Sequence, residues 1–200
     1  MTTWVVFHIV GAYLLGSISS AVLLTKVFTN GDIRKQGSGN PGATNVLRTV
    51  GKKAAVVVFV FDVLKGAVPV YAGFLLGYPP LVLSVIALSA CLGHMYPIFF
   101  AFKGGKGVAT ALGAMMPLNG YLALCLLGTW LAVFVIARIS SLAAVATLLL
   151  APVYAFLFKP EYTLAVAILC ALILLKHKSN IQRLLRKKEL KIRPSASKQK

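Results

Sequence analysis

Residues 37–48 form a glycine-rich segment with the composition of an anion-binding loop. The segment reads GSGNPGATNVLR, in which small residues lead into a candidate helix. Loops of this kind expose backbone N–H groups that bind anions, and Arg48 could add a bidentate contact to phosphate. The residues that could bind alongside it are Ser38, Gly39, Asn40, Thr44 and Asn45. The same composition is equally typical of a structured turn, so the segment alone leaves both interpretations open.

A second glycine-rich segment, FKGGKGVAT at residues 102–110, precedes a short apolar run. Free N–H groups and the positive end of the helix dipole favour an anion at the N-terminus of the helix expected there. The spacing is not that of a nucleotide-binding P-loop, because Phe100 and Gly107 occupy two of its required positions. We therefore predict a second anion site, formed by Lys103, Gly104, Gly105, Lys106 and Gly107.

A third polar segment, KHKSNIQR at residues 176–183, follows the last apolar run. His177 and Asn180 stand one helical turn apart in it, and Glu189 follows nine residues after Asn180. A basic segment is a common anchor at the end of a membrane span, so this pattern alone is weak evidence for a site. Ser141, at the start of another apolar run, could contribute a hydroxyl to the same cluster.

The composition indicates that a membrane must position these segments. Of the 200 residues, 58% are hydrophobic and only 12% are charged, whereas a soluble domain is about 25% charged. Together with a mean hydropathy of +0.85, this excludes an ordinary soluble globule and a disordered chain. The formal net charge of +17 points first to a cytoplasmic membrane face and anionic lipid, not to nucleic acid. The four carboxylates are too scattered to promise a metal site, and no metal or other cofactor is expected.

Apolar runs divide the chain into candidate membrane segments, for which about 20 residues are needed. The runs are 4–25, 54–76, 81–101, 108–116, 121–137, 142–158 and 162–175. The fourth run is too short to cross, so we predict a half-helix, a turn near 116–120 and a return helix. Most cations then fall on one side, which the positive-inside rule places in the cytoplasm. The predicted fold is an all-α integral membrane protein with about seven transmembrane helices, its N-terminus outside and its C-terminus cytoplasmic.

The sequence leaves open the number of segments and the role of two charged residues, and it sets the boundary of the membrane domain. One kinked helix over 108–137 is the alternative to the half-helix and would leave six segments. Asp62 and Lys65 lie one turn apart inside the second run, as a functional pair or a neutralising ion pair. Residues 1–193 are predicted to form a single membrane domain, with 181–192 as an amphipathic helix on anionic lipid. Residues 194–200 are predicted to be a disordered basic tail.

The polar segments would meet at one membrane face, a geometry that fits a substrate with a phosphate head and a fatty tail. In order and sequence, GSGNPGATNVLR, GHMYP with FKGGKGVAT, and HKSNIQRLL resemble the three signature motifs of the bacterial acyl-phosphate:glycerol-3-phosphate acyltransferases, the PlsY family. The resemblance covers nearly the whole chain. It implies an inner-membrane enzyme of phospholipid biosynthesis with a cytoplasmic active site. Such an enzyme moves an acyl chain from acyl phosphate to the 1-position of glycerol 3-phosphate, yielding lysophosphatidic acid and inorganic phosphate.

The resemblance also implies roles for individual residues. The implied catalytic residues are Arg48, Lys106, His177 and Asn180. The implied substrate-binding residues are Ser38, Gly39, Asn40, Asn45, Lys103, Gly104, Gly105, Gly107, Ser141 and Glu189. One position departs from the family pattern: Lys187 stands where the third motif usually has Gly, two residues before its Glu. The resemblance therefore does not by itself define the local turn at that point.

Acyl phosphate is already activated, so the transfer needs no covalent enzyme intermediate. The general base is either His177, whose unperturbed pKa is near neutral, or a phosphate group of the substrate. The expected partners are the two substrates and membrane lipids, without nucleic acid, and a monomer is the working expectation. The alternative function is a membrane transporter of an organic phosphate, because broken helices with N-termini aimed at an anion are typical of transporters.

Overall fold

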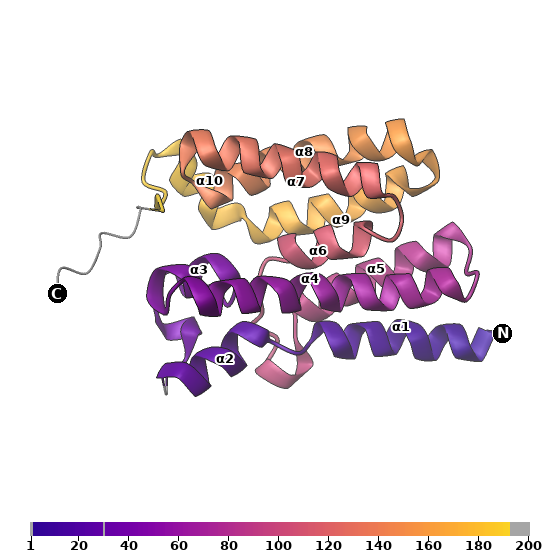
Figure 1. The fold of residues 1–200 in the computed structure, drawn as a ribbon, viewed down its shortest axis with the longest axis horizontal. Helices are drawn as coiled ribbons and strands as arrows, with labels where there is room; N and C mark the ends of the chain where they lie inside the picture. Colours follow the sequence, from indigo (N-terminus) through magenta and orange to yellow (C-terminus); the bar gives the residue numbers. More distant parts are fainter. Residues whose placement is uncertain (1, 30, 193–200) are drawn as a thin grey trace.

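Every regular element of the part that the computed structural model describes, residues 2–29 and 31–192, is a helix. The α-helices are α1 (Thr2–Gly16), α2 (Ser20–Thr29), α3 (Ala43–Thr49), α4 (Lys52–Leu75), α5 (Pro80–Met95), α6 (Val108–Met115), α7 (Gly120–Ala137), α8 (Ser140–Phe158), α9 (Thr163–Lys176) and α10 (Lys178–Leu185). Three short 3₁₀ turns, Ile33–Lys35, Ile98–Phe100 and Pro160–Tyr162, lie in the connections. The long helices run side by side along one direction (Figure 1). The predicted all-α class is confirmed for these residues.

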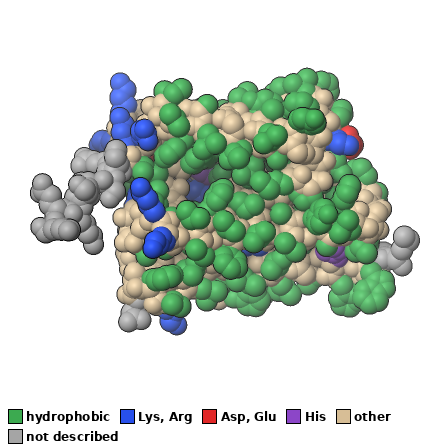
Figure 2. All heavy atoms as spheres, in the orientation of Figure 1, with side chains coloured by type: hydrophobic (Ala, Val, Ile, Leu, Met, Phe, Trp, Pro, Cys, Tyr) green, Lys and Arg blue, Asp and Glu red, His purple; other side chains and the backbone are tan. Residues whose placement is uncertain are grey.

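The helices are long and apolar enough to make this a multi-pass membrane protein. Five candidate spans occur in the described residues: Thr3–Thr29, Lys52–Leu75, Pro80–Phe100, Gly120–Ala137 and Ser140–Phe158. A sixth is possible if α9 and α10, bent by 65°, act as one span. Large apolar side chains cover the visible face (Figure 2), which suits lipid and not water. The expected total of about seven segments, counting the half-helix, stays a prediction.

The first apolar run is not the single helix that its composition predicts. It breaks at residues 17–19, between α1 and α2. Two polar groups of α4 meet the chain there, since Lys65 Nζ donates to the Ile18 carbonyl at 3.0 Å and Asp62 accepts from Ser20 Oγ at 2.9 Å. Backbone groups freed at membrane depth need partners from protein. These contacts stabilise the break that an uninterrupted apolar run does not suggest.

The short helix α6 is confirmed where the sequence predicts it, with a turn after it. The chain reverses direction between α6 and α7 (Figure 1), so the single kinked helix over 108–137 is not formed. Asn119 caps α7 by accepting from the Leu122 N–H at 2.9 Å. Close packing holds α6 on α4: a Cβ on Gly66 or Gly113 would lie 2.0 Å from a backbone carbonyl oxygen of the other helix. Glycine at both positions therefore lets the two backbones touch.

The charges lie mainly at one end of the helical bundle. Figure 2 shows Lys and Arg side chains at its left end, where α2, α3 and α10 lie in Figure 1. The opposite end carries Lys159 and Glu161, whose Nζ and Oε1 atoms are 3.4 Å apart. This asymmetry favours the predicted orientation, with the cationic end in the cytoplasm.

Candidate active site

A cavity of about 620 Å³ opens among α3, α4, α6, α7 and α8. Residues 186–192, which we call the C-terminal segment, line one side of it through Glu189 and Ile192. This volume lies in the range of small-molecule sites. Eleven of the residues predicted from the sequence line it: Ser38, Asn40, Thr44, Asn45, Arg48, Lys106, Gly107, Ser141, His177, Asn180 and Glu189. The three polar segments, distant in sequence, therefore meet at one cavity.

Four other predicted residues do not line the cavity: Gly39, Lys103, Gly104 and Gly105. Gly39 has a φ of +72°, a left-handed conformation that favours glycine and turns the first loop. Gly104 and Gly105 pack against the end of α5 behind the cavity, where added Cβ atoms would lie 2.1 Å from atoms of His94. Lys103 is exposed. We place the two packed glycines in a supporting role.

A chain of hydrogen bonds runs through the polar end of the cavity. Lys106 Nζ donates to Asn180 Oδ1, and Asn180 Nδ2 donates to Glu189 Oε1 at 2.7 Å. The second carboxylate oxygen of Glu189 accepts from Arg183 Nε, also at 2.7 Å. Burial lowers the pKa of Lys106 to about 8. This lysine therefore carries its charge at neutral pH and begins to lose it in mildly basic solution.

Glu189 is held ionised in this chain. Burial raises the pKa of its carboxyl, but hydrogen bonds from Arg183 and Asn180 outweigh that effect, so the pKa lies below its ordinary value. An ionised Glu189 orients the Asn180 amide so that its oxygen faces Lys106. The carboxylate therefore positions the lysine through Asn180 and need not touch a substrate.

The C-terminal segment turns back over the cavity and does not continue as the amphipathic helix predicted for 181–192. Helix α10 ends at Leu185, and Lys187 adopts a left-handed φ of +56° at the position where the family motif usually has Gly. The turn is closed by hydrogen bonds from the Lys188 N–H to the Arg183 carbonyl and from the Ile192 N–H to the Arg138 carbonyl, both 2.8 Å. These bonds, with those of Glu189, offset the cost of that conformation.

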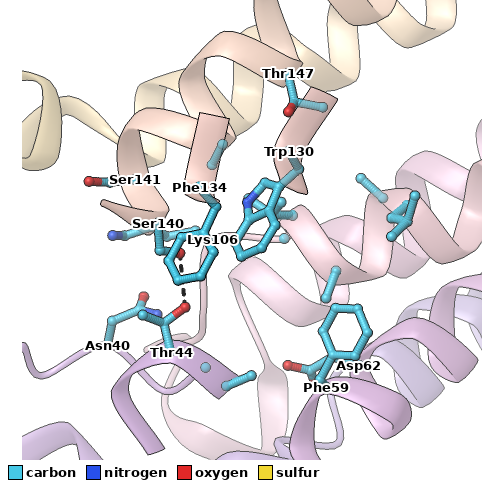
Figure 3. A pocket seen from close by; sticks show the side chains of 18 of the residues that line it. Asn40, Thr44, Phe59, Asp62, Lys106, Trp130, Phe134, Ser140, Ser141 and Thr147 are labelled. Carbon is cyan, nitrogen blue, oxygen red and sulfur yellow. Dashed lines mark hydrogen bonds between the residues drawn. The ribbon is translucent and has the colours of Figure 1, made fainter. Parts of the chain in front are cut away.

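The first glycine-rich segment forms a loop whose shape depends on Asn45. This side chain is fully buried, accepts from the Ser38 N–H at 2.9 Å, and donates to the Gln36 carbonyl at 2.9 Å. Its amide is thus occupied within the loop, which favours a role in shaping the site. Thr44 Oγ1 lies 3.0 Å from Ser140 Oγ, a bond across the cavity wall between α3 and α8 (Figure 3).

Arg48 extends from α3 to the C-terminal segment. Its Nη2 donates to the Leu190 carbonyl at 3.1 Å, while its buried Nε has no hydrogen-bond partner among the described residues. Burial lowers the pKa of its guanidinium, but an arginine stays charged at any physiological pH. An unpartnered buried guanidinium nitrogen in a cavity is well suited to bind an anion.

His177 is almost completely buried at the junction of α9 and α10. Its Nδ1 lies 2.8 Å from the Ile173 carbonyl oxygen, which can only accept a hydrogen bond. Nδ1 therefore carries a proton, and Nε2 is the nitrogen left to accept one when the ring is neutral. A histidine held in this tautomer is geometrically fit to act as a general base.

The rest of the cavity is lined mainly by apolar side chains, although Asp62, His94 and Thr147 also line it. Phe59 of α4 lies across from Trp130 and Phe134 of α7 (Figure 3). Helix α8 lines it with one face, from Ser140 at the polar end to Ala151. These two residues are eleven positions apart on the helix, a rise of about 16 Å. The cavity thus combines a cationic polar end with an apolar channel of that length.

Sequence reasoning missed several residues of this cavity. Phe59, Trp130 and Phe134 lie in apolar runs, where nothing separates a cavity-lining side chain from a lipid-facing one. His94 lines the cavity too, and its buried Nδ1 has no hydrogen-bond partner among the described residues. Over residues 2–29 and 31–192, no three His, Cys, Asp or Glu side chains lie together in a way that could hold a metal ion.

Fold and site together define a multi-pass membrane protein whose cavity suits an anionic amphiphile. The sequence pattern of the glycerol-3-phosphate acyltransferase family matches residues 6–187, and the chain belongs to this family. A glycerol-3-phosphate acyltransferase of Vibrio campbellii is 60% identical over 181 residues, covering 90% of this chain and 89% of the relative. One of Vibrio cholerae O1 (strain N16961) is 57% identical over 192 residues, covering 96% and 92%.

Two solved structures have the same fold. Both are of PlsY, described as an integral membrane glycerol 3-phosphate acyltransferase, and both are 39% identical to this chain. The glycerol 3-phosphate form has a TM-score of 0.90 and covers 94% of this chain and 96% of its own. The lysophosphatidic acid form has a TM-score of 0.87, with 94% and 95% covered. Acyltransferase activity is thus supported by family membership and by fold.

Proposed function

We propose that this protein transfers an acyl chain from acyl phosphate to the 1-hydroxyl of glycerol 3-phosphate. The observation that carries the proposal is the position of Lys106 and Arg48 at the polar end of a channel that is about 16 Å long and otherwise mainly apolar. The cations suit the phosphates of both substrates, and the channel suits the acyl chain. The names of the relatives, and the glycerol 3-phosphate and lysophosphatidic acid forms of PlsY, support the acceptor and the product.

The reaction is a direct displacement at the carbonyl carbon. The 1-hydroxyl oxygen forms the new ester bond, the bond from the carbonyl carbon to the bridging phosphate oxygen breaks, and its electron pair leaves with inorganic phosphate. Lys106 and Arg48 stabilise the charge on the tetrahedral oxyanion and on the departing phosphate, where one well-placed donor contributes about 3 kcal/mol. Holding the hydroxyl against the carbonyl contributes several kcal/mol more.

The hydroxyl proton has two candidate acceptors. One is Nε2 of His177, whose tautomer the Ile173 carbonyl fixes; the other is a phosphate oxygen of the substrate. Replacing His177 with Asn, which keeps a hydrogen-bonding side chain but no base, separates them. A rate reduced by about 10²-fold or more would assign the proton to His177, and a smaller loss would assign it to the substrate.

We propose the following roles for the site residues. The first loop, with Ser38, Gly39 and Asn40, binds a phosphate, and Asn45 holds that loop in shape. In the second loop, Lys106 and Gly107 bind the other phosphate, while Gly104 and Gly105 pack behind the cavity. Asn180 and Glu189 orient Lys106, and Ser141 supplies a hydroxyl to the polar end of the cavity. We place the site in the cytoplasm, with the N-terminus outside, in a monomer of the bacterial inner membrane.

The donor assignment is tested with purified protein in detergent or lipid mesophase. Glycerol 3-phosphate is supplied with acyl phosphate, acyl-CoA or acyl carrier protein, each alone and without added metal. Lysophosphatidic acid is expected only with acyl phosphate. Product from acyl-CoA alone would overturn the donor assignment. Uptake of labelled glycerol 3-phosphate into vesicles without any lipid product would instead show that the protein is a transporter.

A further inference from the structure

A buried polar cluster lies beside the cavity, centred on Asp62 of α4. Three groups from three parts of the chain approach its Oδ1: Ser20 Oγ at 2.9 Å, Lys65 Nζ at 2.9 Å and His94 Nδ1 at 3.6 Å. Asp62 is 3% exposed and lines the cavity, where it lies next to Phe59 (Figure 3). Ionisable groups at membrane depth are costly, and such groups are by default candidates for a function.

His94 connects this cluster to the second glycine-rich loop. Its carbonyl oxygen accepts from the Gly105 N–H at 3.1 Å, and a Cβ on Gly105 would lie 2.1 Å from its Nε2. A Cβ on Gly104 would lie equally close to the carbonyl oxygen. The residue thus supports both glycines between Lys103 and Lys106 from behind. Any displacement of His94 would move the loop.

Asp62 restrains the ring of His94 from the opposite side. Nδ1 of that ring is buried and has no hydrogen-bond partner among the described residues, so the carboxylate, 3.6 Å away, restrains the ring by packing. Lys65 has a partner besides Asp62, because it also donates to the Ile18 carbonyl at 3.0 Å. If Asp62 served only to neutralise Lys65, nothing would require its carboxylate to lie beside His94 as well.

We infer that Asp62 is a positioning residue that acts through His94 to hold the glycine-rich loop in its phosphate-binding shape. The inference rests on the proposed function, since it takes that loop to bind the phosphate of glycerol 3-phosphate. It differs from a structural ion pair in one consequence. If Asp62 only neutralises Lys65, removing both charges restores binding; if Asp62 holds the loop, removing both does not.

The test is the Kd for glycerol 3-phosphate, measured by calorimetry on purified protein without any acyl donor. Asp62→Asn is expected to weaken binding at least tenfold. The double variant Asp62→Leu/Lys65→Leu, which leaves no unpaired charge and serves if Asp62→Asn fails to fold, is expected to stay folded and to bind at least fivefold more weakly. Glu161→Gln, at the far end of the bundle, is the control that binds as wild type does.

Two results would overturn the inference. One is binding within twofold of wild type by the folded double Leu variant, which would make the cluster a structural ion pair only. The other is full additivity in a cycle of Asp62→Asn and His94→Gln, because residues that act through one another are non-additive. In turnover assays the KM for glycerol 3-phosphate should rise while the KM for acyl phosphate stays unchanged. The Kd is measured without an acyl donor, so a wrong donor assignment would change only the turnover results. The two failures can therefore be told apart.

Discussion

The amide nitrogen of Asn180 donates a 2.7 Å hydrogen bond to Glu189 Oε1, while the amide oxygen of the same side chain accepts from Lys106. The Lys106 ammonium of the second loop, which we propose to be catalytic, is therefore oriented by a carboxylate on the C-terminal segment. In the described part of the chain, Lys106 and Glu189 are connected only through the Asn180 side-chain amide. The orientation of that amide therefore depends on the ability of Glu189 to accept its hydrogen bond.

Glu189→Gln should lower kcat/KM about tenfold or more. The substitution keeps the size of the side chain but removes the charge that accepts from both Asn180 and Arg183, and each hydrogen bond to a charged group contributes about 1.5–3 kcal/mol. Steady-state acyl transfer measures the loss. Glu161→Gln removes a carboxylate at the other end of the bundle and should leave the rate unchanged. Equal rates for wild type and Glu189→Gln would refute the orienting role.

Lys187 offers a test of the turn that carries Glu189. Lys187→Gly should keep full activity, because glycine adopts the left-handed φ of +56° without strain. Lys187→Val should lose several-fold in activity, because a β-branched residue is poorly tolerated there. Lys188→Val, one residue further on, is the matched control and should have little effect. A Lys187→Val protein as active as Lys187→Gly would show that the turn does not position the site.

The activity should fall as the pH rises through about 8. Burial lowers the pKa of Lys106 to about 8; the charged form exists below this value and is lost above it. The pH profile of kcat/KM, which reports the free enzyme, should therefore have a descending limb near pH 8. Lys106→Arg, whose side chain stays charged, should lose that limb even if its rate is lower. The same limb in both proteins would assign it to another group.

Ala151 should limit the length of the acyl chain. It lies at the far end of the face of α8 that lines the cavity, so Ala151→Leu should shorten the channel. We expect kcat/KM to fall more for long-chain than for short-chain acyl phosphates, by about tenfold or more. Ala146→Leu places the same side chain on α8 at a residue that does not line the cavity. An equal loss for all chain lengths would indicate general disruption of packing.

The polar half of the site could be found from the sequence because its residue types are rare in such a chain. Arg48, Lys106 and His177 stand out against long apolar runs, and the short run before Met116 predicts a reversal that the structure contains. The apolar half could not be found in the same way. Trp130 faces the cavity and Trp4 is 74% exposed on the outer surface, yet both lie in similar apolar surroundings.

Two elements of the fold were wrongly predicted for physical reasons. The break at residues 17–19 depends on Asp62 and Lys65 of α4, which a local pattern cannot show. The turn at Lys187 depends on the bonds of Glu189 to Asn180 and Arg183 and on the long-range bond from the Ile192 N–H to the Arg138 carbonyl, which together stabilise a conformation that lysine itself disfavours. In both cases tertiary contacts outweigh local preference. Residues 194–200, predicted to be a basic tail, lie outside the described residues.

The central claim is that the acyl group passes directly from acyl phosphate to glycerol 3-phosphate in this cavity. Rapid mixing of acyl phosphate with a comparable amount of purified protein, followed by glycerol 3-phosphate, tests it most directly. Direct transfer requires that no phosphate is released before the acceptor is added, and that one phosphate then appears for each lysophosphatidic acid formed. A burst of phosphate before the acceptor is added, or phosphate without lysophosphatidic acid after it, would rule out direct transfer.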